Sequence, residues 1–310
     1  MDEICTIFNN TMAPIHSGAA GLRLEYRIAL TLQTATMDSL QTKTVIITGA
    51  SLGVGAATAR AFFEHGANLV LIARGREGLE TLAETLGDPE RIAIEPQDVT
   101  DISAFAGVLE RTEARFGNVD VLVNNAGFHA RGSVESVTAD DLGRMIDVNL
   151  KAPMQLTRLS LPYLRRSASP AVIQVASLAG RTPVPGSASY SASKFGLRAF
   201  SLALTEEMRD SRIKFACVSP GPIDTGFIMD DIDAVSDLTF SQPIVTAEQV
   251  AEEIVKLVSD GRRDAPMPRL SGLLTTLTYL FPALGRAARP VLERKGRRTK
   301  DRLKRERRPR

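Results

Sequence analysis

The sequence predicts an α/β fold in which one doubly wound parallel sheet forms a single domain. Two observations lead to this prediction. Apolar runs rich in β-branched residues alternate with segments such as 55–65 and 103–116, in which apolar residues recur at helical spacing. The first apolar run also leads directly into a glycine-rich turn and a helical segment. Continuous apolar strands that alternate with helices indicate a parallel sheet covered on both faces.

The predicted strands are short runs that begin soon after residue 42. They occupy residues 44–48, 68–73, 91–94, 119–124, 171–176 and 214–219. The later part of the chain holds no equally clear strand, and residues 265–270 are the nearest candidate for the last one. We therefore expect the α/β domain to span residues 42–270.

The two ends of the chain differ from this domain. Residues 1–41 show no clear periodicity and are expected to be a disordered extension, and the acidic Asp2 and Glu3 are unlike the start of a secretory signal. Met37 stands just before the first strand, so either it is the functional start or the preceding residues are a real, mobile extension. Residues 271–310 are expected to form an amphipathic, basic C-terminal extension.

Composition and charge exclude several classes of function. The chain has 310 residues, of which 44% are hydrophobic, and a formal net charge of +2. Residues 286–310 hold thirteen Lys and Arg against three Asp and Glu, so the rest of the chain carries a net charge of −8 and is not expected to bind nucleic acid. Cys5 and Cys217 lack the spacing of metal ligands or of a disulfide framework, which favours a cytoplasmic location and no metal site.

A glycine-rich turn joins the first predicted strand to the following helix. Gly49, Gly53 and Gly55 form a Gly-x-x-x-Gly-x-Gly pattern. Glycines allow the backbone to turn tightly and to approach a pyrophosphate, and a helix N-terminus offers free N–H groups to it. The pattern therefore indicates a dinucleotide site, although a glycine-rich turn of this kind can also be purely structural.

The end of the second predicted strand bears on which nucleotide binds there. A site for NAD usually has an acidic residue at this point to hold the ribose hydroxyls, and its carboxylate would repel the 2′-phosphate of NADP. Residues 68–76 contain no acidic residue, whereas Arg74 and Arg76 follow the strand. We expect Arg74 to bind the 2′-phosphate; the alternative is an ordinary solvated arginine.

Tyr190 and Lys194 are spaced four residues apart at the start of an amphipathic helical segment, so their side chains share one face. A phenol transfers protons near neutral pH only when its phenolate is stabilised, and a neighbouring ammonium supplies that stabilisation. A tyrosine and a lysine at this spacing also occur as an ordinary exposed pair, so the pair alone does not establish catalysis.

Several motifs taken together carry more weight than any one of them. In chain order they are the glycine turn, 124–127 (Asn-Asn-Ala-Gly), Asn149, Ser177, Tyr190 with Lys194, and 220–222 (Pro-Gly-Pro). Over residues 42–260 this pattern resembles the short-chain dehydrogenase/reductase family. The resemblance implies a single Rossmann domain, a small-molecule carbonyl or alcohol substrate, NADP(H) as cofactor and assembly as a homo-oligomer.

The resemblance also implies a role for each catalytic residue. Tyr190 would give its proton to a carbonyl oxygen or take one from an alcohol. Ser177 would hydrogen-bond the substrate oxygen and stabilise developing charge. Lys194 would lower the pKa of Tyr190 and hold the nicotinamide ribose, and Asn149 would hold a water that links Lys194 to solvent.

A longer set of residues is expected to contact the cofactor. Asp98 and Val99 would meet the adenine, and residues 220–225 the nicotinamide carboxamide. The full set is Gly49, Ser51, Leu52, Gly53, Val54, Gly55, Arg74, Asp98, Val99, Asn125, Ala126, Gly127, Tyr190, Lys194, Pro220, Gly221, Ile223 and Thr225. Leu52 departs from the pattern, because many NADP-preferring members carry Arg or Lys there, so selectivity is expected to rest on Arg74.

The residues favour an enzyme that moves a hydride between NADP(H) and a carbonyl or alcohol. A non-catalytic NADP-binding sensor or scaffold is the alternative, and epimerisation or dehydration is a third option on such a scaffold. Residues 222–245, which we call the substrate loop, mix apolar residues with Asp230, Asp231, Asp233 and Asp237. The apolar residues of this loop favour an apolar carbonyl substrate. The alternative is that they only pack a flexible lid.

The C-terminal extension combines an apolar stripe with basic residues. The stripe consists of Leu270, Leu273, Leu274, Leu277, Leu280, Phe281 and Leu284. It lies within residues 270–285, an uncharged run of sixteen residues that contains Pro282 and is too short to span a bilayer. One hypothesis is a peripheral anchor on an anionic membrane beside the active site. The other is that the stripe packs against the enzyme body or a partner subunit, while the cations form a solvated, disordered end.

Overall fold

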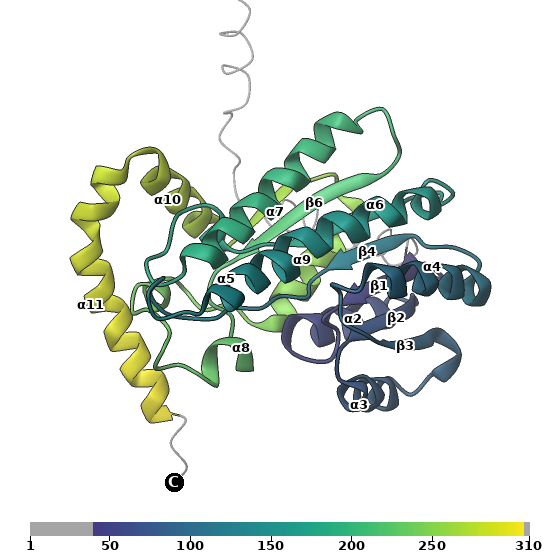
Figure 1. Ribbon diagram of the computed structural model, residues 1–310, viewed down its shortest axis with the longest axis horizontal. Helices are drawn as coiled ribbons and strands as arrows, with labels where there is room; N and C mark the ends of the chain where they lie inside the picture. The colour runs from purple at the N-terminus through teal and green to yellow at the C-terminus, as the bar shows by residue number, and fades with distance from the viewer. Residues whose placement is uncertain (1–39, 307–310) are drawn as a thin grey trace, which may run out of the picture. The chain divides into compact units, whose positions relative to one another are not determined.

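The computed structural model describes residues 40–306. Seven strands form one sheet in the order β3-β2-β1-β4-β5-β6-β7, and every neighbouring pair is parallel (Figure 1). This confirms the doubly wound parallel sheet that the sequence predicts. The expectations about the N-terminal extension and about Met37 lie outside the described residues.

The strands begin and end close to the predicted positions. β1 (Thr44–Thr48) and β2 (Asn68–Ala73) have the predicted bounds. Four others differ by one or two residues at their ends: β3 (Ile92–Pro96), β4 (Val121–Asn124), β5 (Ala171–Val175) and β6 (Lys214–Pro220). The last strand, β7 (Asp264–Met267), is shorter than the predicted 265–270. Pro268 follows it and lacks the N–H needed to continue the ladder, and a helix begins at Arg269.

Helices connect the strands and cover both faces of the sheet. They are α2 (Gly53–Glu64), α3 (Arg76–Leu86), α4 (Ile102–Phe116), α5 (Ala139–Ile146), α6 (Ala152–Leu164), α7 (Ala188–Glu207), α8 (Gly226–Met229), α9 (Ala247–Ser259), α10 (Arg269–Leu280) and α11 (Pro282–Glu306). Short helical turns are η1 (Pro89–Arg91), η3 (Leu178–Gly180) and η4 (Thr239–Ser241), and η2 (Asp147–Lys151) is a π-helical turn between α5 and α6.

Alternating residues of each central strand enter two separate cores. Val45 and Ile47 of β1 belong to the core beneath α2 and α9, whereas Ile46 belongs to the core beneath α4 and α6. All three side chains are fully buried. Side chains on a strand alternate between the two faces, so a continuous apolar run is what a sheet covered on both sides requires.

The strand order places the candidate site at one edge of the sheet. The order reverses between β1 and β4, whose carboxyl ends lead into 49–53 and 125–132. In open α/β sheets, ligands bind in the crevice beyond the carboxyl ends of the strands at such a reversal. The segments that follow β5 and β6 reach the same edge, which brings the sequence motifs together.

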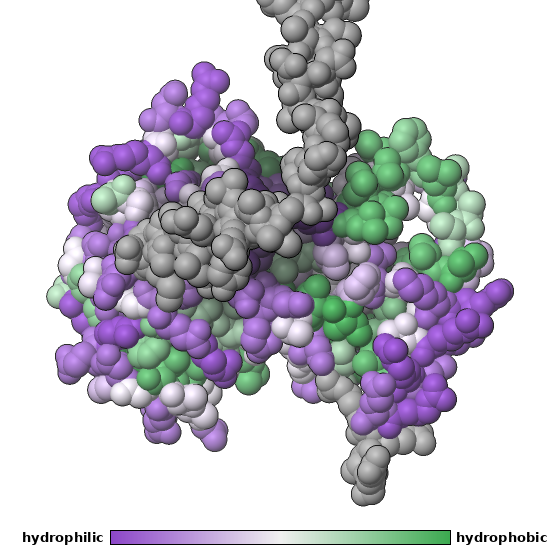
Figure 2. All heavy atoms as spheres, turned by 180° about the vertical axis from the view of Figure 1, so that it is seen from behind, coloured by the Kyte–Doolittle hydropathy of each residue, from purple (hydrophilic) through white to green (hydrophobic). Residues whose placement is uncertain are grey.

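The C-terminal extension is helical, as expected, and α11 packs against η4 of the substrate loop. Most of the stripe does not pack into the body of the described chain, because Leu270, Leu273, Leu280, Phe281 and Leu284 are all more than half exposed. Leu274 and Leu277 are less exposed, at 47% and 39%. Figure 2 shows an apolar patch over α10 and the start of α11, next to the hydrophilic second half of α11. None of the helices within residues 40–306 combines the length and hydropathy that a bilayer-spanning helix needs.

Candidate active site

The glycine turn brings the N-terminus of α2 close to the end of β4. Gly49 and Gly53 have φ values of 65° and 54°, in the region that favours glycine. A Cβ on Gly55 would collide with the carbonyl oxygen of Gly49, and one on Gly49 would lie 2.9 Å from Cα of Ala126. The turn therefore requires glycine, and it leaves the first N–H groups of α2 available to an anion, which fits a dinucleotide pyrophosphate.

Asn125 and Thr48 hold this turn against the segment after β4. The Asn125 amide nitrogen Nδ2 donates to the carbonyl oxygens of Thr48 and Gly49 at 2.9 and 3.1 Å. In return, the Thr48 hydroxyl accepts from the backbone N–H groups of Asn125 and Ala126, both at 3.0 Å. Asn124, the first residue of the 124–127 motif, supports the sheet from inside, because its buried amide donates to Thr157 Oγ1 at 3.1 Å.

The groups expected to select the nucleotide surround the ends of β2 and β3. Arg74 is exposed directly after β2, and Leu52 is 78% exposed at the start of α2. Burial raises the pKa of Asp98, but hydrogen bonds from Thr100 and the charges of Arg74 and Arg144 lower it below its usual range overall. Arg74 is thus near enough to Asp98 to act on it electrostatically.

One large cavity, of about 920 Å³, contains most of the predicted site. Thirteen of the predicted residues line it: Gly49, Gly53, Val54, Asn125, Ala126, Gly127, Ser177, Tyr190, Lys194, Pro220, Gly221, Ile223 and Thr225. The others do not: Ser51, Leu52, Gly55, Arg74, Asp98, Val99 and Asn149. Asp98 borders a smaller cavity of about 180 Å³ instead. Most of the predicted cofactor contacts and three of the four predicted catalytic residues therefore face a shared space.

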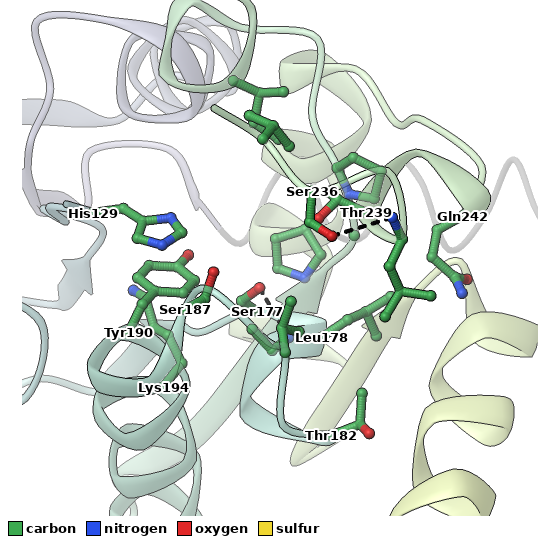
Figure 3. A pocket seen from close by; sticks show the side chains of 18 of the residues that line it. His129, Ser177, Leu178, Thr182, Ser187, Tyr190, Lys194, Ser236, Thr239 and Gln242 are labelled. Atoms are coloured by element: carbon green, nitrogen blue, oxygen red, sulfur yellow. Dashed lines mark hydrogen bonds between the residues drawn. The ribbon is translucent and has the colours of Figure 1, made fainter. Parts of the chain in front are cut away.

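Tyr190 faces this cavity from the first turn of α7, and Ser177 lies beside it after β5 (Figure 3). Tyr190 keeps some accessible surface because it faces the cavity, yet burial raises the pKa of its phenol. A hydrogen bond with the Ser177 side chain and the charge of Arg131 act in the opposite direction and lower that pKa. Both groups favour the phenolate, but burial is the larger effect, so the pKa of Tyr190 lies above its usual value overall. Lys194 is not among the groups that oppose burial, so its predicted lowering of this pKa stays a prediction.

Lys194 lies one turn further along α7 and is only 4% exposed. Its Nζ donates to the carbonyl oxygen of Val175 at 2.8 Å and lies 5.8 Å from the centre of the Tyr190 ring. Burial lowers the pKa of Lys194 to about 8. The ammonium is therefore close to the phenol, held by one backbone oxygen and able to donate further hydrogen bonds into the cavity.

Asn149 lies in the π-helical turn η2 and is fully buried. Its side chain fixes the segment after β4, because Oδ1 accepts from the Phe128 N–H at 2.7 Å and Nδ2 donates to the Phe128 carbonyl at 2.8 Å. A Cβ on Gly127 would lie 3.6 Å from Asn149 Oδ1 and 3.7 Å from Lys194 Nζ. Asn149 and Lys194 therefore border the same small space.

The comparisons with known proteins agree with this geometry. Residues 43–235 match the model of a family described as short chain dehydrogenase. The chain belongs to the short-chain dehydrogenase/reductase family. It is 31% identical over 292 residues to a bovine protein named dehydrogenase/reductase SDR family member 7B, which covers 87% of this chain and 88% of the relative.

Two bacterial relatives show a similar level of identity. An uncharacterized oxidoreductase of Staphylococcus saprophyticus is 36% identical over 210 residues, which covers 67% of this chain and 83% of the relative. A protein of Nostoc named ketoacyl reductase HetN is 31% identical over 261 residues, covering 83% of this chain and 89% of the relative. The chain is therefore an oxidoreductase of this family, whose members use nicotinamide cofactors.

The family match ends at residue 235, and the C-terminal helices complete the cavity beyond it. Residues of α10 and α11 that line it include Leu274, Tyr279, Arg286 and Leu292. Tyr279 packs on Phe195 of α7 with ring centres 5.4 Å apart. In this short-chain dehydrogenase, the wall opposite Tyr190 is built in part by the C-terminal extension.

Ion pairs join α11 to the substrate loop. Lys300, which is 9% exposed, donates to the carbonyl oxygens of Asp233 and Val235 at 3.0 and 2.7 Å. Arg297 pairs with Asp237 at 3.1 Å, and Lys304 pairs with Asp233. The cations up to Lys304 therefore belong to a helix and do not form the disordered end that one hypothesis expected. Arg297, Lys300 and Lys304 hold the loop, whereas others such as Lys295 are exposed to solvent, as that hypothesis expected.

Sequence reasoning missed two residues that face Tyr190. His129 stacks on the Tyr190 ring, and Arg131 donates through Nη2 to the carbonyl oxygen of Phe227. Both follow the 124–127 motif by only a few residues and line the cavity. The segment after β4 leaves the carboxyl end of a strand at the point where the strand order reverses, and such segments line the ligand site. That position was the signal that could have identified both residues.

Proposed function

We propose that this chain is an NADP(H)-dependent carbonyl reductase or alcohol dehydrogenase. The observation that carries the proposal is that Tyr190, Ser177 and Lys194 face the same cavity as the glycine turn. Bound nicotinamide would supply the hydride during reduction and accept it during oxidation. The chain itself must bind the carbonyl, stabilise charge on its oxygen and deliver a proton.

Tyr190 delivers that proton in the proposed mechanism. The Ser177 side chain is close enough to Tyr190 to lower the pKa of its phenol, so a substrate oxygen placed between the two hydroxyls would receive two hydrogen bonds. Such donors stabilise the negative charge that develops on the oxygen as hydride arrives. Lys194 holds the ribose of the cofactor and, as a cation near the phenol, favours the phenolate left after proton transfer.

Asn149 supplies the path by which Tyr190 regains its proton. Its side chain is occupied by Phe128, so its backbone carbonyl is the group that we assign to hold a water next to Lys194. Asn149 lies in the π-helical turn η2, and Pro153, four positions later, has no N–H that could continue an α-helical ladder to that carbonyl. The proline therefore favours a carbonyl that binds water.

The preference for NADP(H) over NAD(H) is assigned to Arg74. It stands exposed after β2, where a carboxylate would otherwise hold the ribose, and it already acts on Asp98. The apolar residues of the cavity favour an apolar carbonyl compound, and the ketoacyl reductase relative bears a name that fits reduction of a carbonyl.

A non-catalytic NADP-binding sensor is the alternative function. Incubation with NADPH and a panel of medium-chain ketones, followed by nicotinamide absorbance, separates the two functions. The enzyme consumes NADPH only when a ketone is present. Tight NADPH binding without consumption across the whole panel would instead support the sensor.

A second proposal is that α10 contacts an anionic membrane from a cytoplasmic location. Its leucines are exposed, and cations follow in α11. Full-length protein should cosediment with vesicles that contain phosphatidylserine and should be released by salt. The variant with Leu270, Leu273 and Leu277 changed to Ser should remain in the supernatant, and wild-type protein that stays there at low salt would contradict the proposal.

A further inference from the structure

The charges of the large cavity are all positive. Among the described residues that line it are Arg131, Lys194, Arg286 and Arg289, and none of these lining residues is Asp or Glu. Arg289 is partly neutralised by Glu293, whose carboxylate lies 2.7 Å away. A pocket with cations and no carboxylate concentrates anionic ligands. Lys194 is assigned to the cofactor ribose, so the cations beyond it require another explanation.

Arg131 is the cation that lies near the proposed reaction centre. Its charge acts on the phenol of Tyr190, and its guanidinium lies 5.2 Å from the centre of the Phe227 ring. Nη2 donates to the Phe227 carbonyl, which leaves the other N–H groups of the fork unassigned. Burial lowers the pKa of Arg131, and the field of Asp231 only partly opposes this.

No carboxylate of residues 40–306 forms an ion pair with Arg131, although many other arginines in this part of the chain have such a partner. A half-buried charge without a partner is costly to the fold unless it binds something. An arginine fork that faces a cavity matches the geometry of a carboxylate or a phosphate. The free donors of Arg131 therefore point to an anionic group of the ligand.

His129 places a second polar group next to Arg131. Its Nε2 is buried and has no hydrogen-bond partner within the described chain. Its ring is stacked on Tyr190 at a distance of 4.1 Å between ring centres, and Figure 3 shows it at the cavity beside the phenol. A buried polar atom without a partner beside a ligand cavity is expected to be satisfied by the ligand.

We propose that Arg131 and His129 bind an anionic group of the substrate, which is an oxo compound with a carboxylate or phosphate close to its carbonyl and an apolar body. This rests on the proposed function and names its substrate class. When the carbonyl carbon lies at Tyr190 and Ser177, the anionic group lies on the His129 side. The apolar body extends past Leu178 toward Leu274 and Leu292 of the C-terminal helices.

The test compares matched substrates on matched variants. The substrates are β-oxooctanoate, its methyl ester, and the phosphate monoester of a hydroxymethyl ketone whose alkyl chain has the same length. In both anions the charged group and the alkyl chain lie on opposite sides of the carbonyl. Wild-type enzyme with NADPH should show a kcat/KM at least about tenfold higher for one of the two anions than for the neutral ester, because charge-assisted hydrogen bonds are the stronger ones. Which anion is preferred identifies the group as carboxylate or phosphate.

Variants then separate recognition from a purely structural role of Arg131. Arg131→Gln should lower kcat/KM for the anion about tenfold more than for the ester, and Arg131→Lys should recover part of the difference. Arg166→Gln is the control, because Arg166 also lies over an aromatic ring but is outside the cavity, where it is paired with Glu113. This variant should keep the wild-type ratio of kcat/KM for the anion to kcat/KM for the ester.

Two results would overturn the proposal. Equal kcat/KM for ester and anions in the wild type would remove the need for an anion site. An equal loss for both substrates in Arg131→Gln would mean that Arg131 only holds Phe227. If nothing is reduced, the proposed function fails, and calorimetric titration of octanoate then tests the anion site alone; equal affinity in wild type and Arg131→Gln would overturn it.

Discussion

The imidazole of His129 lies almost parallel to the phenol of Tyr190, with ring centres 4.1 Å apart and an angle of 13° between the ring planes. The two residues come from different parts of the sheet edge, since His129 follows β4 and Tyr190 lies in the first turn of α7. Burial lowers the pKa of His129 to about 3, and the nearby charges of Arg131 and Lys194 add to that effect. A neutral imidazole therefore covers one face of the phenol at physiological pH.

The depressed pKa of His129 should make the fold less stable in acid. In the unfolded chain, histidine titrates near about 6.5, so between that pH and about 3 the unfolded state binds more protons than the folded state. The free energy of unfolding should therefore fall as pH drops below about 6.5, by roughly 1 kcal/mol per pH unit from this residue.

Denaturant unfolding at several pH values between neutral and mildly acidic measures this effect. His129→Phe keeps an aromatic ring on Tyr190 but cannot be protonated, so its unfolding free energy should fall less steeply than that of the wild type. If both proteins lose stability with the same slope, His129 is not held neutral by the fold.

Cofactor affinity should depend on the protonation of Lys194. Burial lowers the pKa of Lys194 to about 8, so its ammonium is present below that pH and is lost above it. The affinity for NADPH should then fall as pH rises from about 7 to about 9.5, because a neutral amine binds ribose hydroxyls and attracts phosphates less strongly.

Fluorescence titration of NADPH across this range gives the dissociation constants. Lys194→Arg stays protonated throughout, so its weaker affinity should change little with pH. A wild-type affinity that is constant over the range would show that the charge of Lys194 does not contribute to binding.

The sheet was the most predictable part of this molecule. β1 and β2 have the predicted bounds because strands covered on both faces need unbroken apolar runs, and such runs stand out between polar segments. β7 was less predictable, because its sequence Asp-Ala-Pro-Met carries little apolar pattern at an edge of the sheet. Its partner β6 determines its position, and that pairing is not visible in a local segment.

Arg74 should distinguish the two nicotinamide cofactors. Arg74→Ala removes a charge-assisted contact to the 2′-phosphate, so the affinity for NADPH should fall about tenfold or more while that for NADH changes little. Arg76→Ala is the matched control, because the Arg76 side chain is paired with Glu80 at 3.5 Å. Equal losses of NADPH and NADH affinity in Arg74→Ala would place the selectivity elsewhere.

Lys300 should hold the substrate loop in place, although it does not itself line the cavity. Lys300→Met removes the donor to the carbonyl oxygens of Asp233 and Val235, which leaves two acceptors without their partner. We expect a several-fold rise in KM for the ketone, faster proteolysis within 226–241 and an unchanged affinity for NADPH. Lys295→Met, an exposed lysine of the same helix, should change none of these. A wild-type KM and cleavage rate in Lys300→Met would show that α11 does not control the loop.

The candidate site was predictable where a motif has a fixed spacing and less so where distant segments meet. Tyr190 and Lys194 are one helical turn apart, so their shared face follows from sequence alone. Lys300 and Asp233 are far apart in the chain, and each was visible only as part of a basic tail or an acidic loop. Their opposite charges were a signal for the pairing, but charge alone does not specify which residues meet.

The acid/base role of Tyr190 is the central claim, and Tyr190→Phe tests it most directly. The variant keeps the ring that stacks on His129 and loses only the hydroxyl that hydrogen-bonds Ser177. NADPH-dependent reduction of a ketone that the wild type accepts should fall by about 100-fold or more, since general acid catalysis is typically worth at least that much. The dissociation constant of NADPH, measured by fluorescence on the same preparation, should stay within about twofold of the wild-type value. Retention of more than about a tenth of the wild-type rate, with NADPH still bound, would contradict the assignment of Tyr190 as the proton donor.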